Sequence, residues 1–166
     1  MKKRSFTALL CSVVIVSTLA GCSSTPSGSS SPSTEPENEP YESVEDQQIR
    51  MTAGDVEVMI MLNGTRSAAD LAAMLPLELQ LIERNSFAKG MTLPERLSGE
   101  EPVTREYEIG DFGYWAAGPD LAIFYDDIYE QTIVEIIPLG HAAEGAEEMA
   151  SVSGTVRLEL ISELAE

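Results

Sequence analysis

Residues 110–127 read GDFGYWAAGPDLAIFYDD, and this glycine-bounded stretch predicts two neighbouring strands of a β-sheet. It holds the chain's only tryptophan, two of its four phenylalanines and two of its five tyrosines. Aromatic residues favour strands, and a Gly-Pro-Asp sequence is typical of the turn between them. We therefore expect strands at 112–116 and 121–125, paired as a hairpin. Alternation along each strand should turn some of the rings inward and others to the surface.

The sequence around this hairpin predicts further short strands and little helix. Val56, Val58, Ile60 and Leu62 alternate onto one face of a strand, with methionines on the other face. Strands are also expected at 49–53, 77–81, 133–139 and 155–162, whereas 85–104 reads as a looser excursion. Many short strands punctuated by Gly and Pro favour a mainly β protein, an antiparallel barrel or sandwich.

Two short helices are expected to cover the ends of this β-structure. In the first, Ser67 and Asp70 have the spacing of a capping box, and Pro76 ends the apolar helical pattern. The second is expected at 142–149, where Gly145 weakens it.

The N-terminal residues predict export and lipid attachment. A basic start is followed by an apolar run that ends in Leu19-Ala20-Gly21-Cys22, which is similar to the lipobox of bacterial lipoproteins. The expected organisation is a leader at 1–21, a lipidated Cys22 with a Ser/Pro/Glu-rich tether at 22–47, and a folded domain at 48–164. An ordinary signal peptide with an incidental cysteine is the alternative. The first interpretation places the protein at the cell membrane, facing the extracytoplasmic side.

Charge and cysteine content restrict the partners. The formal net charge of −18 repels nucleic acid, so the expected attachment to the membrane is through the acyl chain on Cys22. Cys11 and Cys22 are the only cysteines, which excludes a cysteine-based zinc site in the folded domain. No cofactor and no metal are expected from the sequence.

Several segments in a fixed order resemble the bacterial cyclophilin-like domain family. They are Gly-Asp-Val-Glu-Val from 54, Asn-Gly-Thr-Arg-Ser-Ala-Ala-Asp-Leu from 63, Gly-Asp-Phe-Gly-Tyr-Trp from 110, Leu-Ala-Ile-Phe-Tyr from 121, and Ile-Ile-Pro-Leu-Gly-His from 136. The resemblance spans roughly residues 49–161. It implies a closed eight-stranded antiparallel barrel with helices at its ends.

The resemblance also bears on function. Cyclophilins isomerise peptidyl-prolyl bonds, and Phe124 matches the pocket phenylalanine of their QFFI strand. Arg84 is the candidate for the arginine of the pocket, although neither the FHR strand nor the Phe-Met-x-Gln run of cyclophilins is present. We therefore expect a non-catalytic module that binds a peptide or protein ligand, with a weak or divergent prolyl isomerase as the alternative. The family resemblance alone also suggests an accessory to a redox partner.

The candidate binding residues are the aromatic ones: Tyr114, Trp115, Phe124 and Tyr125, with Phe124 and Arg84 as catalytic candidates should the protein be an enzyme. His141 is the only histidine, and it is expected to be structural rather than a base or ligand. Asp126, Asp127 and Glu130 follow the second aromatic strand. A solvated loop is the simpler interpretation of these carboxylates than a loose cation site.

Overall fold

The computed structural model describes residues 41–161. The predicted leader, Cys22 and residues 22–40 of the predicted tether lie outside the described residues, as do residues 162–164 of the predicted domain. Residues 41–47, which composition assigns to the tether, contact the folded domain. Val44 is buried against the core, and the Tyr41 hydroxyl donates a hydrogen bond to the Gly64 carbonyl over 2.7 Å. Within residues 41–161, no helix is long and apolar enough to cross a membrane.

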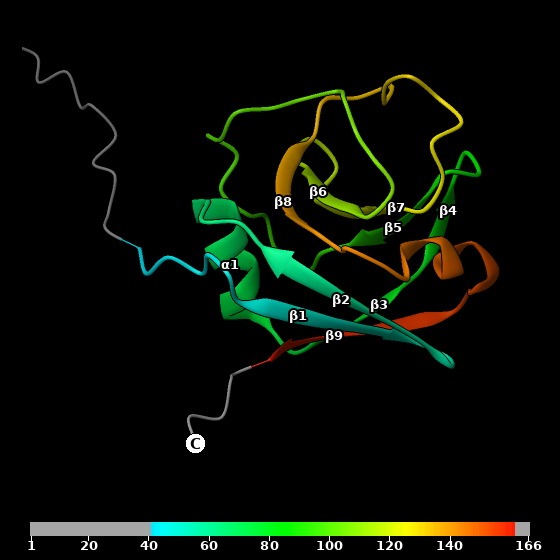
Figure 1. Cartoon of the computed structure of the whole chain (residues 1–166). Helices are drawn as coiled ribbons and strands as arrows, with labels where there is room; N and C mark the ends of the chain where they lie inside the picture. The colour runs from blue at the N-terminus through cyan, green and yellow to red at the C-terminus, as the bar shows by residue number, and fades with distance from the viewer. Residues whose placement is uncertain (1–40, 162–166) are drawn as a thin grey trace, which may run out of the picture. The chain divides into compact units, whose positions relative to one another are not determined.

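The described residues form one antiparallel sheet that curls almost into a closed barrel (Figure 1). It has nine strands in the order β3-β9-β1-β2-β8-β6-β7-β5-β4. Their bounds are β1 Gln48–Ala53, β2 Val56–Leu62, β3 Leu77–Gln80, β4 Ile82–Arg84, β5 Ala88–Thr92, β6 Asp111–Trp115, β7 Asp120–Phe124, β8 Ile137–His141 and β9 Thr155–Ile161.

The predicted count of eight strands in a closed barrel is therefore wrong in detail, and the difference arises at Leu81. The two outermost strands, β3 and β4, are consecutive in sequence and separated only by this residue. β3 pairs with β9 while β4 pairs with β5, and the Leu81 amide donates to the Gly154 carbonyl over 2.8 Å. One bent segment thus joins both edges of the sheet covalently, which leaves little unpaired edge exposed.

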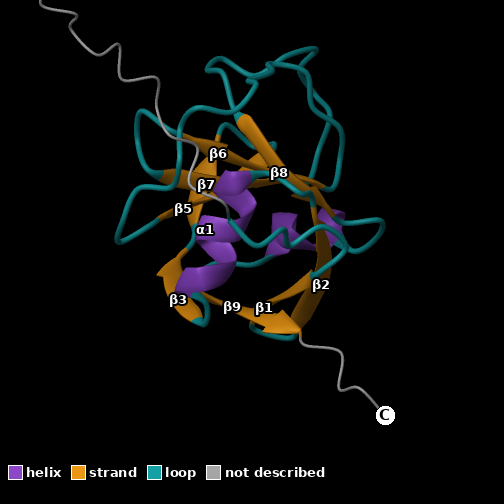
Figure 2. Cartoon of the chain, turned by 90° about the vertical axis from the view of Figure 1, so that its left-hand side faces the viewer, coloured by secondary structure: helices purple, strands orange, loops and turns teal. Residues whose placement is uncertain are grey.

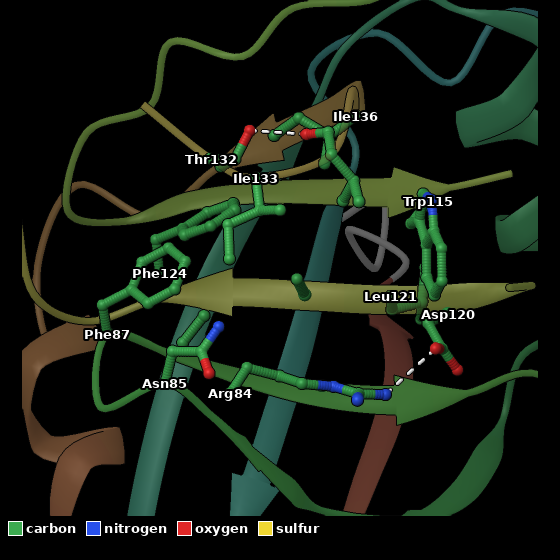
Figure 3. Close-up of a pocket in the computed structure, with 14 residues that line it drawn as sticks. Arg84, Asn85, Phe87, Trp115, Asp120, Leu121, Phe124, Thr132, Ile133 and Ile136 are labelled. Carbon is green, nitrogen blue, oxygen red and sulfur yellow. Dashed lines mark hydrogen bonds and ion pairs between the residues drawn. The ribbon is translucent and has the colours of Figure 1, made fainter. Parts of the chain in front are cut away.

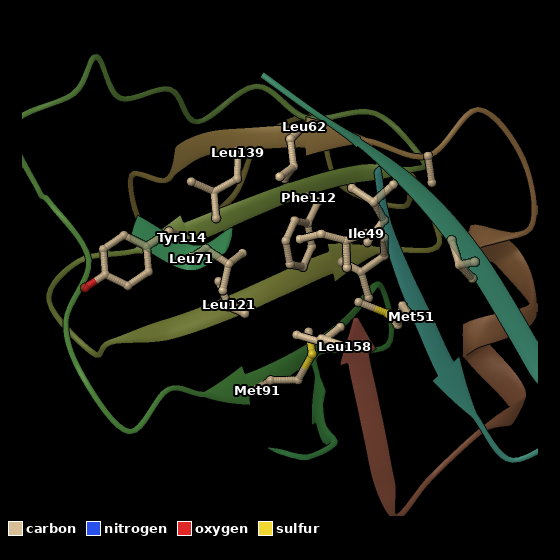
Figure 4. Packing of buried hydrophobic residues seen from close by; sticks show 14 of the residues in the cluster. Ile49, Met51, Leu62, Leu71, Met91, Phe112, Tyr114, Leu121, Leu139 and Leu158 are labelled. Atoms are coloured by element: carbon tan, nitrogen blue, oxygen red, sulfur yellow. The ribbon is translucent and has the colours of Figure 1, made fainter. Parts of the chain in front are cut away.

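The barrel interior is filled by the inward faces of the strands (Figure 4). The aromatic hairpin is confirmed: β6 and β7 pair with Tyr114 opposite Leu121 and Phe112 opposite Ile123. All four of these side chains are at most 1% exposed. Each such side chain contributes about 1.5–3 kcal/mol relative to leaving it in water. The hairpin is therefore a central part of the core.

Helix α1, Arg66–Met74, lies across one end of the barrel (Figure 2) and buries Ala68 and Leu71 in the core. The predicted N-cap is wrong: Thr65 caps the helix and accepts from the Ala68 amide over 3.2 Å. Ser67 lies inside the helix and is buried, and its hydroxyl is satisfied by donating to the Ser98 carbonyl over 2.5 Å.

Three other expectations differ from the structure. Only residues 137–139 of the strand predicted at 133–139 are strand, and the observed strand continues to His141. The Thr132 hydroxyl binds the Arg105 and Val134 carbonyls and holds the preceding residues in a loop. The helix predicted at 142–149 is a 3₁₀ helix, η1 Ala146–Ser151, which begins after Gly145 in a left-handed conformation with φ 84°. Strand β5 lies in the segment that was expected to be loose.

Strand β8 contains a bulge that reverses its alternation. Phe112 pairs with Gly140 and Gly113 pairs with Pro138, so Leu139 is the extra residue opposite β6. Such an insertion re-aims the side chains that follow it. Gly140 then lies so close to β2 that a Cβ atom there would be 2.3 Å from the Met61 carbonyl oxygen. The β2–β8 pairing consists of only two residue pairs and depends on this approach.

We expect Gly140→Ala to destabilise the protein by about 1–3 kcal/mol, because the added methyl group must push β8 away from backbone atoms that cannot move independently. Chemical unfolding monitored by circular dichroism measures the change. Gly99→Ala is the matched control, since a Cβ at Gly99 meets only the Ala116 side chain at 3.6 Å. Equal effects of the two substitutions would contradict the close β2–β8 contact.

Candidate functional site

A groove of about 220 Å³ lies on the outer face of β5, β7 and β6 (Figure 3). Its floor is formed by Gly90 of β5 and Ala122 of β7, which pair with each other, whereas Gly113 of β6, the other partner of Ala122, lies under the Ile136 side chain. Adjacent rows carry larger side chains: Trp115 pairs with Asp120, and Phe124 pairs with Ala88. The strand register therefore creates a shallow trough between two raised rows.

Two glycines allow the side chains that flank the groove to lie close against the sheet. A Cβ at Gly90 would be 2.6 Å from Nε of Arg84, so the arginine side chain lies across this strand. A Cβ at Gly113 would be 3.2 Å from Cδ1 of Ile136. A glycine inside a strand often marks such a close approach. Arg84 and Ile136 thus flank the groove from opposite sides.

One end of the groove carries a polar group of three side chains. Nη2 of Arg84 donates to Oδ2 of Asp120 over 3.0 Å, and the Thr92 hydroxyl donates to Oδ1 over 2.5 Å. Asp120 is mostly buried, whereas the Arg84 side chain is 41% exposed. A guanidinium has five N–H donors, so the ion pair leaves others for a ligand. This end can therefore hold an oxygen atom of a bound molecule.

The other end is aromatic. The Phe124 ring packs against Tyr107 at 4.7 Å and against Phe87 at 5.6 Å between ring centroids. Phe87 also meets Tyr129 edge to face at 5.3 Å. Asn85 and Ser86 both have positive φ values in the turn before Phe87, and this turn directs the Phe87 ring onto the outer face. The cluster fixes the loops that border the groove.

The structure brings three of the predicted site residues together and separates the others. Arg84, Trp115 and Phe124 line the same groove (Figure 3). Tyr114 and Tyr125 face the barrel interior instead. The Tyr114 hydroxyl accepts from the Leu97 amide over 3.2 Å, which pins the 93–99 segment to the core. A role of Arg84, Trp115 and Phe124 in binding stays a prediction.

Tyr125 belongs to a polar cluster with Glu83 and Lys89, in which Tyr125 and Lys89 are buried and the Glu83 side chain is 47% exposed. The tyrosine hydroxyl donates to Oε1 of Glu83 over 2.6 Å, and Nζ of Lys89 lies 2.7 Å from Oε2. Burial, together with the bond to the Glu83 carboxylate, raises the pKa of Tyr125 to about 12. Burial opposes ionisation of Glu83, but the hydrogen bonds from Lys89 and Tyr125 outweigh it and lower the pKa of this carboxyl. The cluster therefore has a structural role where the barrel interior meets solvent.

His141 and the acidic residues of the loop after β7 do not line the groove, although later residues of that loop do. Nδ1 of His141 is 2.9 Å from Oδ1 of Asp111, and both side chains are partly exposed. Asp127 and Glu130 are exposed in the loop that follows β7. Among residues 41–161, no three His, Cys, Asp or Glu side chains are placed to hold a metal ion together.

Several groove residues were missed at the level of sequence. Ile133 and Ile136 belong to a segment that reads as a strand, and Phe87 lies in one that reads as loose. One signal in the sequence could have indicated these contacts. Gly90 and Gly113 each lie inside a strand, and a glycine at such a position indicates close packing against a neighbouring segment.

This barrel, with a groove on the outer face of its aromatic hairpin, agrees with the comparison to known families. The Cyclophilin-like family matches residues 51–160, and the chain belongs to this family. No curated protein matches it at a significant level.

A solved structure is similar as well. The solution structure of the hypothetical protein AF2241 from Archaeoglobus fulgidus superposes with a TM-score of 0.60 at 17% sequence identity. The match covers 72% of this chain and 98% of that protein. At this identity the likeness concerns the fold alone.

The Tyr125 cluster predicts a loss of stability at alkaline pH. Between the ordinary tyrosine pKa of about 10 and about 12, the unfolded chain releases this proton while the folded protein retains it. The free energy of unfolding should therefore fall as pH rises through this window. Tyr125→Phe should reduce the slope, measured by urea unfolding at successive pH values. Tyr129→Phe, in the outer aromatic cluster, should keep the wild-type slope, and an unchanged slope in Tyr125→Phe would refute the assignment.

Proposed function

We propose that this cyclophilin-like domain is a binding module whose groove takes a short extended peptide. The observation that supports it best is the pair Gly90–Ala122, which forms a flat apolar floor between a half-exposed arginine and an isoleucine-lined loop. A large side chain at either position would fill the space. Trp115 and Phe124 lie at opposite ends of the groove (Figure 3).

The groove suits an apolar side chain or a proline ring with a carbonyl group beside it. Trp115, Ile133 and the aromatic cluster offer apolar surface, which contributes about 25 cal/mol per Å² covered. Arg84 supplies hydrogen-bond donors at the edge. Its ion pair with Asp120 uses only some of the five N–H donors of the guanidinium, so Arg84 can bind a carbonyl oxygen without releasing Asp120. A peptide backbone is the ligand that combines these features.

A prolyl isomerase is the second candidate, and the placement of Arg84 and Phe124 in one groove favours it. Rotation about the prolyl bond has a barrier of about 18–20 kcal/mol, which a donor to the prolyl nitrogen lowers. In the structure, Nη2 of Arg84 already donates to Asp120. A carboxylate is a much stronger acceptor than a prolyl nitrogen. Catalysis would therefore need one of the other guanidinium N–H groups, and the missing FHR and Phe-Met-x-Gln motifs favour binding over catalysis.

The proposed location is the extracytoplasmic side of the cell membrane, with the domain held by a lipid on Cys22. The proposal is based on the basic and apolar leader and on Leu19-Ala20-Gly21-Cys22. The strongly acidic composition fits a domain that stays in solution near the membrane instead of lying on anionic headgroups.

The groove is tested with the peptide Ala-Ala-Pro-Phe as probe and Trp115, the only tryptophan, as reporter. We expect a saturable change of tryptophan fluorescence. Ala122→Leu should weaken the affinity at least about tenfold, because the added atoms occupy the floor and cost more than one kcal/mol of contact. Thr52→Leu is the matched control, since Thr52 faces outward on β1, away from the groove.

The same peptide distinguishes the two candidate functions. Binding without faster cis–trans isomerisation supports the binding module. Acceleration that disappears in Arg84→Ala but persists in Thr52→Leu would establish the isomerase. Neither binding nor acceleration would reject the groove as a peptide site.

The lipid anchor has its own test. In a bacterial host, the wild-type chain should sediment with membranes, and its N-terminal peptide should carry an acyl chain on Cys22 by mass spectrometry. Cys22→Ser should release the protein from the membrane fraction, whereas Cys11→Ser should not. An unmodified Cys22 in the exported protein would favour the ordinary signal peptide.

A further inference from the structure

A second region of the outer face gathers two methionines and the only histidine. Val58, Ile60 and Leu62 of β2 fill the core, so Met59 and Met61 point away from it. Met61 is 41% exposed and therefore accessible from solvent. Both methionines and His141 line a shallow pocket distinct from the groove. The pocket therefore combines two thioethers and an imidazole with the carboxylates of Glu57, Glu144 and Glu148.

The strand register places the histidine beside the methionines. Met61 pairs with His141 across β2 and β8, and His141 pairs with Asp111 across β8 and β6. The bulge at Leu139 is what turns His141 outward, since Ile137 and Leu139 of the same strand are buried. Directly paired residues have Cβ atoms about 4.5–5.5 Å apart and diagonal pairs about 7–8 Å. The flexible methionine side chains can bridge such separations.

Asp111 gives the imidazole the orientation of a metal ligand. The 2.9 Å contact joins Oδ1 of Asp111 to Nδ1 of His141. When Nδ1 carries the proton and donates it to the carboxylate, Nε2 presents its lone pair. A histidine that binds a metal ion usually donates its other ring N–H to such a carboxylate.

We propose that Met59, Met61 and His141 form a binding site for a soft monovalent cation, Cu(I), with Asp111 as the residue that positions the imidazole. Thioethers are soft ligands that select Cu(I), and imidazole also suits copper. Glu144 and Glu148 line the same pocket and supply negative charge near a cation. The guanidinium of Arg50, on the neighbouring strand, lies 3.4 Å from the Glu57 carboxylate, which offsets its charge.

The donor set argues against hard cations. Ca²⁺ and Mg²⁺ require clustered oxygen ligands, and zinc sites use Cys, His and carboxylates. Within residues 41–161, no group of three such side chains is placed for a metal ion. Two neutral sulfurs and one imidazole are a poor set for these ions and a suitable one for Cu(I).

The test uses full-length protein carrying Cys11→Ser and Cys22→Ser, so that no thiol competes for the metal. Ag(I), which has the same charge and softness and is not oxidised in air, is titrated into protein with labelled methionine methyl groups. We expect the methyl resonances of Met59 and Met61 to shift and to saturate at one equivalent. Met51, Met74, Met91 and Met149 serve as internal controls and should not shift. No saturable shift, or equal shifts at the control methionines, would overturn the proposal.

Affinity for Cu(I) is then measured by competition with a chromophoric chelator under anaerobic conditions. Met59→Leu, Met61→Leu and His141→Gln should each weaken binding at least about tenfold, and Asp111→Asn by about 10–100-fold. Met74→Leu, on helix α1, is the matched control and should bind as tightly as the parent. Unchanged affinity in both Met59→Leu and Met61→Leu would refute the thioether site. The NMR titration of the unsubstituted site stands even if a variant folds poorly.

Discussion

The antiparallel pairing of β6 with β7 is the interaction on which the rest of the molecule depends. Its register places Phe112 and Tyr114 opposite Ile123 and Leu121, so that one face of the hairpin fills the barrel. The same register brings Gly113 beside Ala122 on the other face. A slip of one residue would exchange these two faces, exposing the core residues and filling the groove. Core packing and groove formation therefore share one cause.

The groove depends on the size of residues more than on their chemistry. Arg84 lies on Gly90 and Ile136 lies against Gly113, so each of these side chains occupies space that a side chain in place of the glycine would fill. Close packing in proteins leaves few voids, and a depression of this kind persists only where the bordering side chains are held elsewhere. Asp120 holds Arg84, and the Thr132 hydroxyl holds the loop that carries Ile136.

Sequence patterns predicted those elements whose signal is local. The strand at β2 follows from strict alternation, and the hairpin of β6 and β7 follows from its aromatic residues and its Gly-Pro-Asp turn. Strand β5 was not predicted because Lys89 occupies an inward position, where its ion pair with Glu83 and the Tyr125 ring make burial tolerable. Glu83 is only six residues earlier in the chain, but the alternation of β5 alone does not indicate that β4 and β5 pair in the register that joins the two side chains.

The candidate site shows the same division. Arg84, Trp115 and Phe124 were identified by residue type, but the assignment of Tyr114 and Tyr125 to the interior needed the register. Tyr125 would be a poor ligand-binding residue in any case, because its hydroxyl is already bonded to Glu83. Side-chain chemistry can be read along the chain, whereas the face to which it points is set by pairing with other strands.

Strand β8, which contains the bulge, lies between β2, which carries Met59 and Met61, and β6, which borders the groove. Without the extra residue at Leu139, alternation from the buried Ile137 would carry His141 into the core, where an imidazole needs a buried partner. The bulge instead aligns His141 with Met61 on one side and with Asp111 on the other. Asp111 begins the strand that also carries Gly113 and Trp115 of the groove. The bulge thus places the pair His141–Asp111 on the outer face, near the apolar floor of the groove. The two regions therefore differ in chemistry although they belong to one continuous sheet.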